Sequence, residues 1–226
     1  MKPIKTPQEA AADIKDNSSI MIGGFMCCGH PFSIINAIIE TGAKNLTLIT
    51  NDAGYPDIGI GKLICQDRTK KLIVSHIGLN PVAGNKMNSK EMEVQLVPQG
   101  TLAERIRAKG AGLGGVLTPT GIGTEVETGK QKITVMEKDY LLETPIGADF
   151  ALIQASICDK YGNCFINKAA KNFNLVMAMA AKTVIVEADK IVEPGELDPE
   201  QVTVPGVFIS AIVQAKKEDT VEKVWN

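Results

Sequence analysis

The sequence predicts an α/β fold: an open, mostly parallel sheet covered by helices, with an added β-hairpin region. Three observations support this fold class. Helical patterns and short apolar runs alternate over the first fifty residues, glycine or proline marks most junctions, and residues 132–142 alternate as in a hairpin. The chain has 226 residues, 44% of them hydrophobic and 22% charged, which is enough for a sizeable core. We expect residues 1–226 to form a single domain.

The first fifty residues predict two helices and two strands around a glycine-rich turn. Thr6 and Glu9 have the spacing of a capping box around Pro7, so a helix begins there, and Asn17 favours its end. The next elements are a strand at Ser19–Ile22, a helix from Pro31 to Gly42 with isoleucines on its apolar face, and a strand at Leu46–Thr50. Alternation of this kind is typical of a parallel sheet.

Four further elements and a glycine-rich loop follow. They are a short helix around Ile60–Cys65, a strand at Lys71–Ser75 before turns at Asn80-Pro81 and Gly84-Asn85, a strand at Val94–Val97, and a helix with a capping box at Thr101–Glu104 that ends at Gly110. Residues 110–124 are so rich in glycine, threonine and proline that we expect a functional loop without regular structure.

The last part of the chain predicts a hairpin, further strands and one helix. In order, these are a hairpin at Lys132–Leu142, a strand at Phe150–Ala155, a tight turn at Asp159–Asn163, a helix at Asn174–Ala181, a strand at Thr183–Val186, and strand candidates at Thr203-Val204 and Phe208–Val213. The charged tail from Lys216 to Asn226 is expected to fray or to pack on a partner.

Charge and cysteine content exclude several classes of protein. A net charge of −2 offers no basic excess for nucleic acid or an anionic membrane, and no apolar run has membrane-spanning length. The five cysteines are an odd number, and two are adjacent, which fits a reducing cytoplasm better than a disulfide framework. Cys27, Cys28 and His30 lack the spacing of a zinc site, so we predict no metal site and interpret them as buried side chains that only fill space in the core.

Polar residues follow the predicted strands at their carboxyl ends. The glycine turn follows Ile22, Asn51 follows the second strand, His76 the third and Gln99 the fourth. Ligands of open parallel sheets bind beyond these ends, so we expect a binding site along one rim. The alternative interpretation is that these residues only form turns, because Asn, Gln and Gly commonly do so.

The turn from Gly23 to Gly29 lets backbone N–H groups approach a phosphate or an oxyanion. Its glycines do not follow the G-x-G-x-x-G spacing of a dinucleotide site, and Asp52 lies beyond the expected acidic position, so NAD is a poor fit. The sequence contains no G-x-S-x-G motif, and no carboxylate is placed as a catalytic acid, base or nucleophile. We therefore expect the reactive group to come from another chain.

Many short segments match one known family in their order along the chain. They are Ile20–Phe25 with Gly29 and Pro31, Leu46–Ile49 with Asn51-Asp52, Gly59–Gly61, Ser75–Gly78 with Asn80-Pro81, Val97–Leu102, Gly112–Gly115 with Thr118–Gly121, Asp159 with Gly162-Asn163, Lys171–Asn174, and Pro205–Val207. From about Ile20 to Val213 the chain resembles the α (A) subunits of two-subunit 3-oxoacid CoA-transferases, close to those of acetate or butyrate:acetoacetate CoA-transferases.

The resemblance implies an enzyme that moves CoA between a short-chain acyl-CoA, such as acetyl-CoA or butyryl-CoA, and a 3-oxoacid such as acetoacetate. Acyl-CoA is then a substrate, and no cofactor is permanently bound. The implied route is ping-pong: a glutamate forms a mixed anhydride and then a glutamyl-CoA thioester. In this family the glutamate belongs to the β subunit, so the resemblance assigns no catalytic nucleophile to this chain.

The resemblance also implies which residues form the site. The CoA-associated turn would be Gly23, Gly24, Phe25, Met26, Cys27, Cys28 and Gly29, acting through backbone donors and the positive end of the helix that begins at Pro31. Asn51, Gln99 and Gly100 would lie at the acyl group, where the two amides donate to a carboxylate or a developing oxyanion. Gly112–Gly115 would shape a wall against the β subunit. A valine at Gly24 should lower CoA binding with little loss of fold.

Two other functions remain as alternatives. The first is a nucleotide-dependent dehydrogenase that uses the glycine turn, although the acidic strand end is missing. The second is a non-catalytic ligand-sensing domain on a related sheet. A repressor of that kind would need a helix-turn-helix, and the residues before the second strand do not predict one. For the transferase, we expect a cytoplasmic location and a β subunit as partner, with no nucleic acid and no membrane.

Overall fold

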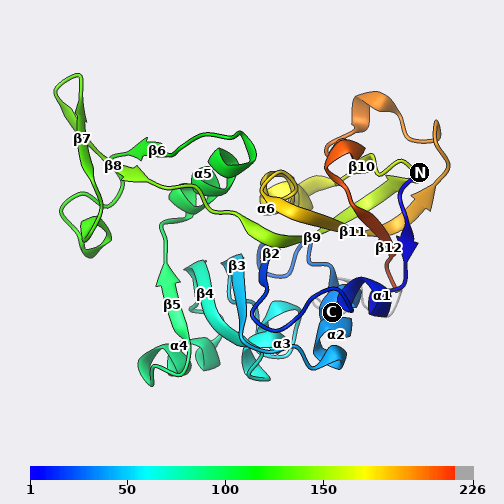
Figure 1. Ribbon diagram of the computed structural model, residues 1–226, viewed down its shortest axis with the longest axis horizontal. Coiled ribbons are helices and arrows are strands. Elements are labelled where there is room, and N and C mark those ends of the chain that lie inside the picture. The colour runs from blue at the N-terminus through cyan, green and yellow to red at the C-terminus, as the bar shows by residue number, and fades with distance from the viewer. Residues whose placement is uncertain (217–226) are drawn as a thin grey trace.

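The computed structural model describes residues 1–216. The charged tail expected at Lys216–Asn226 lies outside the described residues except for Lys216. A sheet of nine strands forms the centre (Figure 1). Its order is β1-β12-β11-β9-β2-β3-β4-β5, and β10 pairs with β9. The strands are β1 (Ile4–Lys5), β2 (Ser19–Ile22), β3 (Leu46–Asp52), β4 (Thr69–His76), β5 (Glu93–Leu96), β9 (Ala148–Asp159), β10 (Cys164–Phe165), β11 (Ala181–Val192) and β12 (Ala211–Gln214).

Every pairing along this order is parallel, and only the β9–β10 pair is antiparallel. In the middle of the sheet, Ile20 of β2 is in register with Leu48 of β3 on one side and with Phe150 of β9 on the other. The prediction of an open, mostly parallel sheet is therefore confirmed. The carboxyl ends of β2, β3, β4 and β5 consequently lie at one edge.

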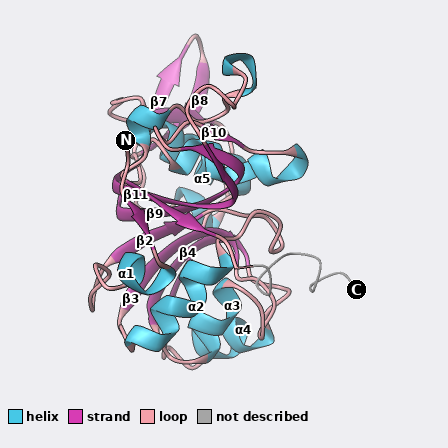
Figure 2. Cartoon of the chain, turned by 90° about the vertical axis from the view of Figure 1, so that its right-hand side faces the viewer, coloured by secondary structure: helices cyan, strands magenta, loops and turns pink. Residues whose placement is uncertain are grey.

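Helices cover both faces of this sheet (Figure 2). They are α1 (Pro7–Ala11), α2 (Phe32–Thr41), α3 (Ile60–Cys65), α4 (Pro81–Asn88), α5 (Gln99–Gly110) and α6 (Asn172–Met177). Strand β2 shows how the faces divide, because Ile20 and Ile22 pack in the core with α1 to α4, whereas Met21 packs in the core with α5 and α6. None of the helices within residues 1–216 has the length and apolarity needed to cross a bilayer.

A second, three-stranded antiparallel sheet projects from one end of the molecule (Figure 1). Its strands are β6 (Val116–Thr118), β7 (Lys132–Val135) and β8 (Lys138–Glu143), in the order β6-β8-β7. Met136 and Glu137 have φ angles of 49° and 64°, as in a two-residue hairpin turn, so the predicted hairpin is confirmed. The expectation that residues 110–124 lack regular structure is wrong for Val116–Thr118, which pair with β8.

The boundaries of several elements differ from the predictions. The capping box of Thr6 and Glu9 is present, but α1 ends at Ala11, and Asn17 (φ 66°) forms a later turn. The expected turn at Gly84-Asn85 lies inside α4, because the Asn80 side chain caps that helix by accepting a hydrogen bond from the backbone N–H of Ala83. The expected capping box at Thr101 is also wrong, because α5 begins at Gln99 and no side chain caps it.

Four further predictions fail because distant strand partners, not local sequence, set the ends of elements. Strands β9 and β11 each run for 12 residues, since they pair with one another far beyond the end of β2. The helix expected at Asn174–Ala181 begins at Asn172 and stops at Met177, because β11 already starts at Ala181. Thr203-Val204 contributes only an isolated bridge between Val204 and Cys164.

Candidate functional site

Two polar side chains from different strand ends meet at the carboxyl edge of the sheet. Asn51 lies near the end of β3, and Gln99 begins α5 after β5 and the two connecting residues Val97 and Pro98. The Gln99 Nε2 donates to Asn51 Oδ1 at 2.7 Å, so the structure brings together two residues that the sequence places on one rim. His76 ends β4 at the same edge and is exposed to solvent.

The environment of Asn51 fixes the direction of its amide. Asn51 is 2% exposed, its Nδ2 donates to Asp52 Oδ2 at 2.8 Å, and its Oδ1 also accepts from Ser75 Oγ at 3.3 Å. Gln99 is exposed, so the amide pair extends from the core to the surface. Each NH₂ group has two hydrogens and uses one of them in these contacts, so one hydrogen on each amide is not used by them.

The buried carboxylate of Asp52 connects this amide pair to the glycine turn. Asp52 Oδ2 accepts from the backbone N–H of Met26 at 2.8 Å, and Oδ1 accepts from Gly54 N at 2.9 Å. The sequence analysis assigned Asp52 no role in the site: it considered this residue as the acidic residue of a dinucleotide site and otherwise only as part of a matching segment. Its position next to Asn51 at a strand end was the available signal.

The turn after β2 is a small hairpin. Phe25 and Cys28 exchange two backbone hydrogen bonds of 3.0 and 2.9 Å, and Met26 and Cys27 between them have φ angles of 46° and 70°. Gly24 has a φ of 125°, and a Cβ there would lie 2.0 Å from the Cδ2 of the buried His30 ring. The expectation that a valine at Gly24 spares the fold is therefore wrong, since the turn itself would be strained.

Two asparagines of α6 hold the turn from the other side. Asn172 Oδ1 accepts from Gly24 N at 3.2 Å, and its Nδ2 donates to Cys28 O at 2.9 Å. Asn174 Nδ2 donates to Gly29 O at 2.9 Å. The sequence contained these residues in the segment Lys171–Asn174, but nothing local in the sequence indicates that they contact a turn almost 150 residues earlier.

Most of the backbone donors in the turn are already used inside the protein. Five amides of Gly23–Gly29 donate to protein acceptors: Gly23, Gly24, Phe25, Met26 and Cys28. The expectation of a cradle of free backbone donors is wrong for these five. What the turn presents to solvent instead is side chain, because Phe25 is 41% exposed and Met26 and Cys28 are half-buried.

The positive end of α2 is also occupied. The carboxylate of Glu187, which is 2% exposed and comes from β11, accepts from Ser33 N at 3.1 Å and from Ile34 N at 2.9 Å. The expectation that this helix end is an anion site is therefore wrong: the anion is part of the chain. A dinucleotide pyrophosphate would need the same N–H groups, which weighs against the dehydrogenase alternative.

Cys27 and His30 are buried neutral groups. His30 is 2% exposed, packs against Phe32 with ring centroids 5.7 Å apart, and has its pKa lowered to about 4 by burial. Burial also raises the pKa of the fully buried Cys27 thiol to about 11, so this thiol is not a thiolate at neutral pH. The interpretation of these two residues as filling is confirmed, whereas Cys28 is only half-buried.

The remaining predicted site residues lie at opposite ends of α5. Gly100 is in its first turn, next to Gln99, and a Cβ there would have no neighbour within 4 Å. Gly112–Gly115 follow its carboxyl end, about 18 Å away along a helix of 12 residues. The structure therefore brings Gly100 to the rim and leaves Gly112–Gly115 away from it.

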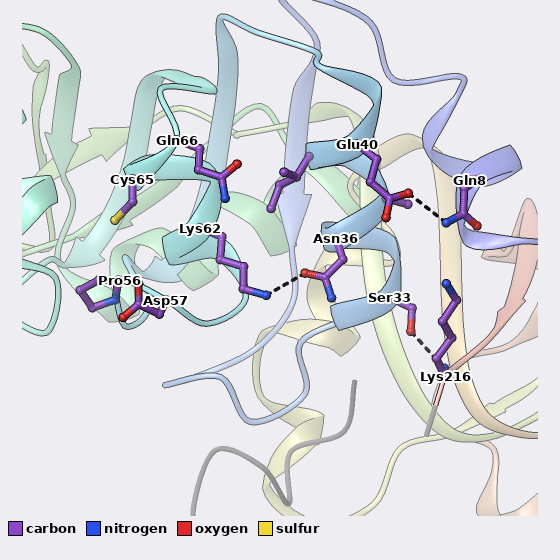
Figure 3. A pocket seen from close by; sticks show the side chains of 12 residues that line it. Gln8, Ser33, Asn36, Glu40, Pro56, Asp57, Lys62, Cys65, Gln66 and Lys216 are labelled. Carbon is purple, nitrogen blue, oxygen red and sulfur yellow. Dashed lines mark hydrogen bonds between the residues drawn. The ribbon is translucent and has the colours of Figure 1, made fainter. Parts of the chain in front are cut away.

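A cavity of about 680 Å³ opens along α2 and α3 (Figure 3). In it, Lys62 Nζ donates to Asn36 Oδ1 at 3.0 Å, and Gln8 Nε2 donates to Glu40 Oε2 at 3.0 Å. Neither the amide pair nor the turn lines this cavity. Its charged lining residues are Glu40, Asp57, Lys62 and Lys216, which give no net charge to select an ion.

The amino-acid sequence matches known proteins over nearly its whole length. The family model for coenzyme A transferase matches residues 4–215. The acetoacetyl-CoA:acetate/butyrate CoA transferase alpha subunit of Clostridium acetobutylicum is 55% identical over 200 residues, which are 88% of this chain and 92% of that protein. The acetate CoA-transferase subunit alpha of Escherichia coli K12 is 50% identical over 214 residues, or 95% and 97% of the two chains.

Solved structures share the fold at lower identity. An acyl-CoA transferase from Escherichia coli O157:H7 superposes with a TM-score of 0.87 at 23% identity over 97% of this chain, which spans only 48% of that longer chain. Glutaconate coenzyme A-transferase from Acidaminococcus fermentans gives a TM-score of 0.82 at 19% identity, with 94% of this chain and 75% of that one covered. Because the family model matches residues 4–215 of 226 and two relatives are 50–55% identical, this chain belongs to the coenzyme A transferase family.

Proposed function

We propose that this chain is the α subunit of a hetero-oligomeric enzyme that moves CoA between a short-chain acyl-CoA, such as acetyl-CoA or butyryl-CoA, and a 3-oxoacid such as acetoacetate. The names of the relatives from Clostridium acetobutylicum and Escherichia coli support this substrate class. Residues 1–226 then act as one CoA-transferase α-type domain. Five free cysteines support a cytoplasmic location.

The amide pair beside the glycine turn is the observation that carries the proposal. Every step of CoA transfer passes through a tetrahedral carbon that bears an oxyanion, and a pair of positioned N–H donors stabilises that charge. Asn51 and Gln99 are hydrogen-bonded to each other, so their orientation is set before a substrate arrives. Gly100 follows Gln99 and leaves open space beside it for the acyl group.

The pairing of the buried carboxylates supports a nucleophile on the partner. Four carboxylates are buried within residues 1–216, and each accepts from protein donors: Asp52, Glu143, Asp159 and Glu187. A carboxylate that is held by hydrogen bonds is a poorer nucleophile, because attack must break those bonds. We therefore assign the catalytic glutamate to the β subunit.

The reaction then proceeds in two symmetrical halves. The glutamate carboxylate attacks the thioester carbonyl and expels the CoA thiolate, which leaves an acyl-glutamyl anhydride. The thiolate attacks the glutamyl carbonyl, releases the first acid as its carboxylate, and forms the glutamyl-CoA thioester. The second acid reverses these steps. In this scheme Asn51 and Gln99 donate to the oxyanions, and the exposed Phe25 side chain contacts CoA together with the half-buried Met26 and Cys28.

Borohydride trapping tests the division of roles. The chain is mixed with its co-purified β subunit and acetoacetyl-CoA, and borohydride then reduces the glutamyl thioester to an alcohol. Peptide mass spectrometry should find the reduced glutamate on the partner, with this chain unmodified and inactive by itself. A reduced glutamate within residues 1–226 would refute the assignment.

A further inference from the structure

One buried carboxylate oxygen touches both parts of the proposed site. Asp52 Oδ2 accepts from Asn51 Nδ2 at 2.8 Å and from Met26 N at 2.8 Å, while Oδ1 accepts from Gly54 N at 2.9 Å. Asp52 is 2% exposed, so solvent does not compete for these bonds. We propose that Asp52 is a positioning residue that sets the orientation of the Asn51–Gln99 amide pair and couples it to the CoA turn. This inference rests on the proposed function, because it concerns the same site.

The charge of Asp52 determines which way both amides point. A carboxylate only accepts, so Asn51 must turn its NH₂ group toward it and its Oδ1 away. That oxygen also only accepts, so Gln99 must present its NH₂ group to it, as the 2.7 Å contact shows. Asp52 therefore sets the orientation of the Asn51 amide, and Asn51 sets that of the Gln99 amide. In this orientation N–H groups remain to face an oxyanion.

The same carboxylate stabilises an unfavourable backbone conformation in the turn. Met26 has a φ of 46°, which is uncommon for a residue with a side chain and persists only where its surroundings fix it. A hydrogen bond from its N–H to a buried charge is among the stronger ones in proteins. The position of the turn and the orientation of the amides thus depend on one side chain.

Replacing Asp52 by asparagine distinguishes the effect of its charge from the effect of its volume. Asp52→Asn keeps the volume but offers an NH₂ group where the carboxylate only accepts, so the Asn51 amide loses its preferred direction. In the reconstituted α–β complex we expect kcat to fall by about 10- to 100-fold, the usual effect of losing a hydrogen bond to a charged group.

A double-mutant cycle tests whether Asp52 acts through Asn51. Asn51→Ala removes the amide, so adding Asp52→Asn to it should lower kcat by no more than about 3-fold further. Losses that multiply instead would overturn the positioning role, as would a wild-type kcat in Asp52→Asn alone. If Asn51→Ala and Gln99→Ala both keep the wild-type kcat, the amide site of the proposed function fails, and the role of Asp52 fails with it.

Asp159→Asn is the matched control. Asp159, the last residue of β9, is 5% exposed and accepts from the same kinds of donor, two backbone amides and one asparagine side chain. The Asp159→Asn variant should lose comparable stability and keep kcat.

If Asp52→Asn does not assemble, Asp52→Glu keeps the acceptors but displaces them by about 1.5 Å, and it should still lower kcat by at least about 10-fold. An unchanged kcat in Asp52→Glu would overturn the proposal.

Discussion

Gly100 occupies a position where the fold does not require a glycine. A Cβ at Gly100 would meet nothing within 4 Å, and its φ is not in the left-handed region. Glycine within a helix costs up to about 1 kcal/mol relative to alanine, so its presence in the first turn of α5 favours a need for empty space. Because Gly100 lies next to Gln99, we propose that a ligand uses this space.

Gly100→Ala should therefore separate stability from activity. We expect the thermal midpoint of the chain to stay the same or rise by about 2 °C, because alanine favours the helix, while kcat/KM of the α–β complex falls by at least about 10-fold. Gly84→Ala is the matched control, since Gly84 lies within α4 and a Cβ there also meets nothing within 4 Å. Gly84→Ala should keep full activity. Full activity in Gly100→Ala would remove Gly100 from the site.

His30 should make the chain less stable in mild acid. Burial lowers its pKa from 6.5 to about 4, so the unfolded chain binds a proton between these values that the folded chain does not. Stability is then full above pH 6.5 and falls as the pH drops toward 4, by about 3 kcal/mol. Urea unfolding across this range should show the loss, and His30→Gln should reduce it. An unchanged pH dependence in His30→Gln would contradict the role assigned to His30.

At the scale of elements, the start of α2 illustrates how this sheet uses its own charges. Helix N-termini in α/β proteins commonly bind a ligand anion, and the glycine turn before α2 suggests the same here. Glu187 instead reaches from β11 and accepts from the N–H groups of Ser33 and Ile34. The helix end thus contributes to the stability of the fold and is not available to phosphate.

Glu187→Gln tests this distinction between structure and binding. The amide is a weaker acceptor, and one side of it is a donor, so we expect the free energy of unfolding to fall by about 1.5–3 kcal/mol. The KM for acyl-CoA should stay within about 2-fold of the wild-type value, because no substrate phosphate uses this helix end. A markedly lower KM would show that removing the charge opens an anion site, and would contradict this account.

At the scale of the whole molecule, the sequence predicts what is local and misses what is distant. The Thr6–Glu9 capping box and the stop at Gly42 (φ 78°) are confirmed, because both depend on neighbouring residues. The strand ends also predict the rim and the proximity of Asn51 and Gln99. Sequence patterns carry no information about Glu187, which caps a helix 153 residues away, or about Asn172, which holds a turn 144 residues away. Because of these contacts, backbone donors of the turn and of the α2 end that were expected to bind a ligand are bonded within the protein.

A buried carboxylate is one of the contacts between the projecting sheet β6-β8-β7 and the rest of the molecule. Glu143, 2% exposed at the end of β8, accepts from Lys130 and lies 3.7 Å from Arg105 of α5. Burial lowers the Arg105 pKa and Glu143 raises it, so the two charges depend on each other. Breaking a buried pair is costly because the remaining charges stay desolvated, by about 3–5 kcal/mol.

Glu143→Gln should therefore loosen this sheet without unfolding the main one. The core clusters of the main sheet contain no residue of β6, β7 or β8, so its unfolding midpoint should change little. Trypsin should cut faster after Lys130 and Lys132, by about 10-fold or more, since local opening controls cleavage. Glu127→Gln is the control, because Glu127, in the short 3₁₀ helix Glu125–Glu127, pairs with Lys132 of β7. The side chains are 28% and 41% exposed, and such partly exposed pairs contribute under about 1 kcal/mol. Equal cleavage rates in the two variants would show that Glu143 does not anchor the projecting sheet.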